Sequence, residues 1–347
     1  MIKRRAVGSL LLSGMLAASL AGSASAQAED KLTVLCTPEA PYCEAMEAAF
    51  EAETGIDTSH VRMSSGESLV RLQAGAANPE FDVWWGGPAD GQIAAGLEGL
   101  VEPYISPNAA AIADGQKAAD GTWTGVYVGA LGFCSNQALL DELGVEAPDS
   151  WEDLLDPKLV DNVMVAHPAS SGTAYTTFYT QVSRFGGDED KALDYMAKLH
   201  DNILYYTKSG AGPGRLAGQG EVAVAIIFSH DCIQNIETGM DLVVSFPSEG
   251  TGYEIAGQSL VANAQHPNNA KTWIDWALTA PAQEIGWRSP TAGAFQLPTN
   301  PDATVSDKAV NISELALVDY DFDAAGAARS RLTERFENEV ATKDSAR

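Results

Sequence analysis

The sequence predicts an α/β protein built on a parallel sheet. From residue 31 onwards, β-type segments alternate with amphipathic helical segments, as expected for strands joined by crossover helices. The apolar run EVAVAII at 221–227 is typical of a strand covered on both faces. No internal repeat or low-complexity linker interrupts the alternation. Because ligands of such sheets bind beyond the carboxyl ends of the strands, the strand-to-helix turns are the places to search for a site.

The first part of the chain contains three predicted strands and two predicted helices. The helix at 43–55 is amphipathic and ends at Gly55, a residue type that commonly terminates helices. The strand FDVWW is followed by a GGP turn. In order, we expect a strand at 31–36, a helix at 43–55, a strand at 57–63, a helix at 67–76 and a strand at 81–85.

The rest of the chain repeats this alternation with different residues. It starts with a long extended run at 124–136, and Ser150 is placed to cap the helix that follows. We expect strands at 162–168, 221–229 and 241–247, and helices at 150–159, 171–186, 188–202, 268–278, 282–287 and 312–340.

A chain of 347 residues has room for two domains, yet no flexible connector separates them. We therefore expect strands to make the crossings between two lobes. The candidates are the segments 129–136 and 253–262.

Residues 1–26 form a predicted secretory signal peptide. The basic start MIKRR precedes a short apolar stretch and the small-residue cleavage site ASA at 24–26. The apolar stretch is too short and too rich in Gly and Ser for a good membrane span, and no other segment is long and apolar enough. No cysteine adjoins the cleavage site to carry a lipid. We therefore expect a free periplasmic protein.

The exported chain is strongly acidic. Removal of the three basic residues of the signal peptide takes the formal net charge from −26 to −29. A surface of this charge repels nucleic acid and anionic lipid, so neither is expected as a partner. The simplest role of the charge is to keep an exported protein in solution.

Four cysteines stand in a chain expected to be exported, where thiols are normally oxidised. Three pairings are possible. Cys36 and Cys43 are seven residues apart across a strand-to-helix turn, so we expect a bond between them, and Cys134 would then pair with Cys232. In this arrangement Cys232 is a structural half-cystine rather than a nucleophile or a metal ligand.

Four strand-to-helix turns are rich in Ser, Thr and Gly, at 36–41, 63–68, 167–175 and 206–215. The start of a helix exposes unpaired N–H groups and the positive end of the helix dipole, so small hydroxyl residues there suit a phosphate or carboxylate. One such turn is weak evidence, because Ser and Thr cap most helices, but four favour an anion site. The last turn also carries Lys208 and Arg215, which are either solvated surface charges or a positive field for an anionic ligand.

The strand at 221–229 delivers His230 and Asp231 at its carboxyl end, next to Cys232. We expect the histidine and the aspartate on the loop after this strand, facing the same cleft as the hydroxyl-rich turns. An imidazole N–H donates hydrogen bonds and a carboxylate accepts them, which suits a polyhydroxylated ligand. The alternative is a core histidine that is satisfied by a neighbouring side chain.

Across nearly the whole exported chain, the sequence resembles the periplasmic solute-binding proteins of ABC importers, in the branch that includes the ferric-iron-binding proteins. The motifs that carry the resemblance lie at 66–87, 147–159, 167–175, 218–226 and 266–278. It implies a type II periplasmic binding fold, in which a ligand cleft lies between two α/β lobes joined by hinge strands. We expect one lobe from 27–130 and 257–310, and the other from 131–256 and 311–347.

The segments 206–232 and 246–257 resemble the subgroup that binds hexose phosphates. The resemblance implies that His230, Asp231 and Glu254 hold sugar hydroxyls, while the cleft loops hold the phosphate. The loop residues that it implies are Thr37, Ser65, Ser171, Thr173, Thr207 and Ser209. The expected role is delivery of a sugar phosphate or similar organophosphate to an ABC permease by a monomer that needs no cofactor.

Two other functions stay open at this point. Ferric-binding relatives carry adjacent tyrosines just after the strand that here precedes FSHDC, so iron would have to bind differently, through His230, Asp231 and Glu254. A hydrolase could use His230 and Asp231, or Cys232 as nucleophile. The chain has neither a Gly-x-Ser-x-Gly elbow nor a His-Glu-x-x-His motif, so we expect a binding protein and not an enzyme.

Overall fold

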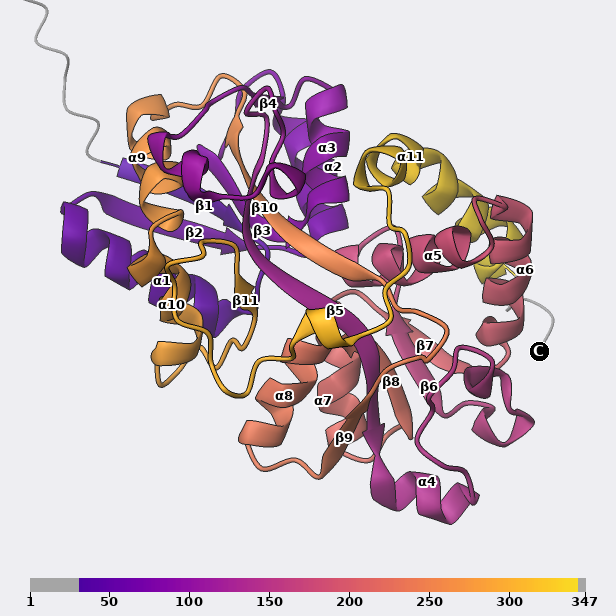
Figure 1. The fold of residues 1–347 in the computed structure, drawn as a ribbon. Coiled ribbons are helices and arrows are strands. Elements are labelled where there is room, and N and C mark those ends of the chain that lie inside the picture. The colour runs from indigo at the N-terminus through magenta and orange to yellow at the C-terminus, as the bar shows by residue number, and fades with distance from the viewer. Residues whose placement is uncertain (1–30, 343–347) are drawn as a thin grey trace, which may run out of the picture.

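The computed structural model describes residues 31–342, and the predicted signal peptide at 1–26 lies outside them. Eleven strands form one continuous sheet, with the path β2-β1-β3-β10-β5-β8-β6-β7 and three short strands beside it. Figure 1 shows β5 and β10 running together through the middle of the molecule. The strands are β1 (Lys31–Cys36), β2 (Asp57–Arg62), β3 (Val83–Pro88), β4 (Val101–Glu102), β5 (Thr124–Asn136), β6 (Val163–Ala166), β7 (Ile203–Thr207), β8 (Val224–Phe228), β9 (Leu242–Ser245), β10 (Tyr253–Val261) and β11 (Leu297–Pro298).

The sheet is mixed, which corrects the expectation of a purely parallel one. The first half of the sheet (β1, β2 and β3) and the second half (β6, β7 and β8) are each parallel. The two central strands run against their neighbours, because β10 is antiparallel to β3 and β5, and β5 is antiparallel to β8. The alternation of strands and helices predicts the parallel parts but not the two long strands that join them.

Both segments predicted to cross between the halves lie in these central strands. Residues 124–130 of β5 pair with β10, whereas Leu131 is the first residue of β5 to pair with β8. The register of β10 shifts beside Gly257 against both of its neighbours, β3 and β5. The chain therefore passes twice from one half to the other through extended backbone.

Helices cover both faces of the sheet, and each half has its own apolar core. In Figure 1, α1, α9 and α10 lie beside the first half and α5 and α6 beside the second, while α11 packs against α3 as well as against α5 and α6. The α-helices are α1 (Ala40–Thr54), α2 (Ser65–Gly75), α3 (Ala89–Leu97), α4 (Gln137–Leu143), α5 (Gly172–Arg184), α6 (Glu189–His200), α7 (Gly212–Gly218), α8 (Ser229–Glu237), α9 (Pro267–Ala277), α10 (Ala280–Arg288) and α11 (Phe322–Glu339).

The helix predicted at 150–159 is wrong. Two single-turn 3₁₀ helices stand there, at Asp153–Leu155 and Pro157–Leu159. Pro157 has no N–H to donate and disfavours helical backbone at Asp156, so one continuous helix cannot form.

The helix predicted at 312–340 begins later, at Phe322. The preceding segment instead pairs with Thr251, whose N–H donates to the carbonyl of Ala316 and whose carbonyl accepts from the N–H of Val318. Asp321 then caps α11 by accepting from the N–H of Ala324. A tertiary pairing therefore takes the place of the first turns of the predicted helix.

Both predicted disulfides are confirmed. Cys36 is bonded to Cys43 across the turn between β1 and α1, and Cys134 of β5 is bonded to Cys232 of α8. The second bond removes the thiol that a Cys232 nucleophile would need. Among residues 31–342, no helix has the length and apolar character of a membrane span.

Candidate ligand-binding site

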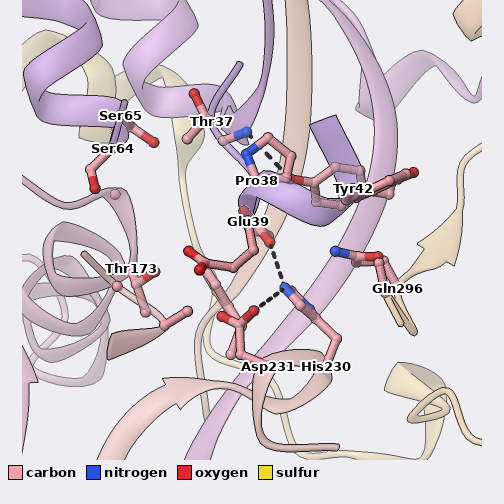
Figure 2. Close-up of a pocket in the computed structure, with 18 of the residues that line it drawn as sticks. Thr37, Pro38, Glu39, Tyr42, Ser64, Ser65, Thr173, His230, Asp231 and Gln296 are labelled. Carbon is pink, nitrogen blue, oxygen red and sulfur yellow. Dashed lines mark hydrogen bonds and ion pairs between the residues drawn. The ribbon is translucent and has the colours of Figure 1, made fainter. Parts of the chain in front are cut away.

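A pocket lies between the two halves of the sheet, at the carboxyl ends of their strands. The first half of the sheet contributes the turns after β1 and β3 and the start of α2. The second half contributes the start of α5, the loop before α7 and the first turn of α8. Tyr127 of β5 and Glu254 of β10 line it from the central strands. Figure 2 shows Ser64, Ser65, Thr37 and Thr173 on one side and His230, Asp231 and Gln296 on the other.

The hydroxyl-rich wall is formed by two helix starts that face each other. Ser65 opens α2, and Ser171 caps α5 by accepting from the N–H of Ala174. The two starts are in direct contact, since the N–H of Gly66 donates to the carbonyl of Ser170 at 2.9 Å. Both helices have their positive dipole ends at the pocket, so this wall attracts an anion.

His230 and Asp231 occupy the first turn of α8, where we had expected a loop. Apolar residues four apart, Cys232 and Ile236, give this segment an inward face, which explains why it forms a helix. The His230 Nε2 lies 3.7 Å from Asp231 Oδ1 and 3.7 Å from Glu254 Oε1. The imidazole packs so tightly on β5 that a Cβ on Gly129 would lie 2.5 Å from His230 Nδ1.

Burial controls the charge of this cluster. It lowers the pKa of His230 to about 3 and raises the pKa of Asp231 to about 8. Glu39 raises the Asp231 pKa further, whereas Arg62 lowers it. Burial, followed by the nearby Asp231, raises the pKa of Glu254 well above its ordinary value. All three groups are therefore neutral near pH 7 in this structure, so the carboxyl groups can donate as well as accept hydrogen bonds.

The Asp231 pKa predicts a pH dependence of stability. The folded protein keeps this proton up to about pH 8, whereas the unfolded chain loses it near pH 4, so the stabilisation is full below about pH 4, is lost progressively between about pH 4 and pH 8, and changes no further above about pH 8. We expect the melting temperature of the ligand-free protein to fall from about pH 5 to about pH 8, and that of Asp231→Asn to fall less. Scanning calorimetry of both proteins would measure the two slopes, and equal slopes would contradict the assignment.

An ion pair between Arg62 and Glu39 lines the pocket near the ends of the outermost strands, β2 and β7. Arg62, at the end of β2, donates to Glu39 Oε1 at 2.6 Å and to the carbonyl of Pro38 at 3.1 Å. Its guanidinium also donates to Ser209 Oγ at 3.3 Å, across to the loop after β7. Ser209 donates in turn to Glu39 at 3.3 Å.

Seven of the nine candidate residues line the pocket, namely Thr37, Ser65, Ser171, Thr173, His230, Asp231 and Glu254. Thr207 and Ser209 do not. The Thr207 hydroxyl donates to the carbonyl of Ser209, and the Ser209 hydroxyl is engaged by Arg62 and Glu39. Lys208 and Arg215 are also absent from the wall, where the basic side chain is Arg62.

Sequence reasoning missed several polar residues of the wall. Arg62 could have been found, because it stands at the carboxyl end of a predicted strand, directly before the hydroxyl-rich turn at 63–68. Glu39 lies inside one of the four predicted turns. The remaining side chains come from elements that carry no local signal for a site, namely Tyr42, Gln234 and Gln296.

The comparison with protein families decides the class. Residues 45–315 match the family model described as bacterial extracellular solute-binding protein. The chain belongs to this family. Solute-binding proteins hold a small molecule between two α/β units, which is the arrangement of the pocket described above. The predicted family and fold class are both confirmed.

Two relatives of this solute-binding protein span most of its length. A Haemophilus influenzae protein is 38% identical over 333 residues, which are 94% of this chain and 95% of the relative. A Salmonella typhimurium protein, named as a candidate 2-aminoethylphosphonate-binding periplasmic protein, is 28% identical over 280 residues, which are 78% and 77% of the two chains.

Solved structures show the same fold. The periplasmic binding protein AfuA of Actinobacillus pleuropneumoniae, solved with exogenous fructose 6-phosphate bound, has a TM-score of 0.86 and 40% identity, over 90% of this chain and 98% of its own. The periplasmic binding protein P5PA has a TM-score of 0.86 and 34% identity, over 90% of this chain and 100% of its own. Iron-bound HitA of Pseudomonas aeruginosa, at 17% identity and a TM-score of 0.74 over 88% and 98%, shows a shared fold alone.

The geometry bears on the metal alternative. Among residues 31–342, no three His, Cys, Asp or Glu side chains come together as a metal-binding group. His230, Asp231 and Glu254 are neighbours, and His230 Nε2 lies 3.7 Å from an oxygen of each carboxyl group.

Proposed function

We propose that this protein is the periplasmic substrate-binding component of an ABC importer and that it binds a phosphorylated sugar, such as a hexose phosphate, or a similar organophosphate. The observation that carries the proposal is the division of the pocket into two unlike walls. Two helix starts with small hydroxyl residues suit a phosphate, whereas the cluster of His230, Asp231 and Glu254 suits sugar hydroxyls.

The relatives support the same class of ligand. AfuA was solved with fructose 6-phosphate, and the Salmonella relative is named for a phosphonate, so both names involve a small organic molecule with a phosphorus oxyanion. Both proteins align with most of this chain. In this proposal Thr37, Ser65, Ser171 and Thr173 hold the oxyanion.

The two halves of the sheet act in this proposal as two lobes that close over the ligand. The lobes are residues 27–130 with 257–310, and residues 131–256 with 311–347. The change of pairing partner at Leu131 and the shift in register beside Gly257 support these boundaries. Closure is favourable when the ligand contacts both lobes, because those contacts exist only in the closed form.

The protein works in this proposal as a monomer in the periplasm that passes its ligand to a permease and catalyses no reaction. Cys232 is in a disulfide, so it offers no thiol nucleophile. Export would follow from the signal peptide predicted at 1–26.

Isothermal titration tests the proposal directly. Purified protein is titrated with fructose 6-phosphate, glucose 6-phosphate, 2-aminoethylphosphonate and inorganic phosphate, with fructose as the uncharged control. We expect saturable binding of at least one hexose phosphate and much weaker binding of fructose. Absence of binding to every organophosphate would exclude the proposal, and stoichiometric metal that survives dialysis against a chelator would favour the metal alternative.

A further inference from the structure

The pocket contains an ion pair that the division into phosphate and sugar walls does not use. Arg62 and Glu39 are in contact at 2.6 Å, and both side chains line the pocket while keeping about a quarter of their surface exposed. Figure 2 shows Glu39 between the wall of Ser64, Ser65 and Thr173 and the wall of His230 and Asp231. A ligand that spans the two walls must therefore pass beside this carboxylate.

Arg62 is the only Lys or Arg among the described residues that line the pocket. Its guanidinium makes a fork of N–H donors that matches the geometry of carboxylates and phosphates. In the structure Glu39 occupies part of this fork, with Ser209 and the carbonyl of Pro38 as the other acceptors. The cation is thus already neutralised by a resident anion.

We propose that Arg62 is the specificity-determining residue for the charged group of the ligand, and that Glu39 is a built-in competitor which the ligand displaces. This inference rests on the function proposed above. A phosphate with nearly two negative charges near pH 7 attracts the guanidinium more strongly than one carboxylate does. A neutral sugar has no charge with which to displace Glu39, so the pair discriminates against it.

The competitor lowers the affinity for a charged ligand, because that ligand must replace Glu39 on the guanidinium. Specificity is a difference between two affinities, and here the difference comes from Arg62, whose contact with a charged group is stronger than its contact with an uncharged one. Removal of Glu39 should therefore tighten binding, whereas removal of Arg62 should weaken it. Because Glu39 acts through Arg62, removal of Glu39 should have no such benefit once Arg62 is gone.

The test is a double-mutant cycle measured by titration with fructose 6-phosphate. We expect Arg62→Gln to weaken binding roughly tenfold or more, and Glu39→Gln to tighten it roughly threefold or more. In the Arg62→Gln background, Glu39→Gln should give no tightening. Arg62→Lys, which keeps the charge but loses the fork, should fall between Arg62→Gln and the unmodified protein.

Arg71 and Glu80 provide matched controls. They form a similar ion pair, at 2.7 Å on the exposed surface beside α2, and neither lines the ligand pocket. Arg71→Gln and Glu80→Gln remove the same charges and should leave the affinity unchanged. Thermal melts of all variants identify any that does not fold.

The outcomes separate this inference from the proposed function. If the unmodified protein binds no organophosphate, the proposed function fails. If the unmodified protein binds an organophosphate, and a folded Arg62→Gln or Arg62→Lys variant binds that ligand equally well, only the role of Arg62 is overturned. If Glu39→Gln weakens binding, Glu39 is a ligand contact and the competitor role is overturned.

Discussion

Replacement of Gly66 by alanine is expected to weaken ligand binding roughly a hundredfold or more, about 2.7 kcal/mol, while the unloaded protein stays folded. In the present structure a Cβ on Gly66 would lie 2.1 Å from the carbonyl oxygen of Ala169 and 2.8 Å from the carbonyl carbon of Ser170. These are backbone atoms, so they cannot rotate away as a side chain would. The clash lies between α2 and the loop before α5, and separation of the two halves relieves it.

The reason for the large effect is that the strain falls on one state only. The N–H groups of Gly66 and Glu67 both donate to the carbonyl of Ser170, so the two halves meet here backbone to backbone. In the lobe closure proposed above, a methyl group at this position would oppose the form in which α2 and the α5 loop touch, which would shift the equilibrium away from the form that holds the ligand.

Gly75, the last residue of the same helix, is the control for this experiment. A Cβ there would meet no atom within 4 Å, so Gly75→Ala should leave both binding and stability nearly unchanged. Titration with fructose 6-phosphate and melting curves of the ligand-free variants provide the two measurements. A Gly66→Ala protein that binds as tightly as the unmodified one would show that the contact between α2 and the α5 loop does not accompany binding.

Asp231→Ala is expected to weaken binding of the same ligand at least tenfold, about 1.4 kcal/mol. Asp231 is 15% exposed in its side chain, lines the pocket and lies beside His230 and Glu254. A ligand hydroxyl buried against it would lose its partner on truncation, and an unpaired buried polar group is costly.

Asp231→Asn separates hydrogen bonding from charge. The raised pKa keeps Asp231 protonated near pH 7, and asparagine has nearly the shape of that neutral acid. We therefore expect a smaller loss for asparagine than for alanine. An unchanged titration curve for Asp231→Ala would count heavily against the site, whereas equal losses for both variants would indicate that the ligand requires the ionised carboxylate.

Much of the site was predictable because its signals are local. Hydroxyl residues that precede helices, such as Ser171, are recognised from a few neighbouring residues, and the carboxyl ends of parallel strands converge whatever the loops contain. His230 and Asp231 were found for the same reason, although they open α8 and do not lie in a loop. The spacing of Cys36 and Cys43 across one turn likewise predicted both disulfides.

Other features depend on where distant segments meet. Thr207 looks like a site residue in sequence, but its hydroxyl turns to the carbonyl of Ser209. Arg62 and Glu39 are 23 residues apart, and nothing in either neighbourhood predicts their contact. The segment before α11 has a helical pattern and yet pairs with Thr251.

By itself, the sequence determined the class of protein, the strand-to-helix turns that supply the pocket and the pairing of the cysteines, since each of these depends on residues close together in the chain or on a short pattern. Only the tertiary structure decided the antiparallel central strands, the direction in which each turn residue points and the ion pair of Arg62 with Glu39. The physical reason is that these features arise from hydrogen bonds and charges between segments whose approach is set by the packing of the whole chain.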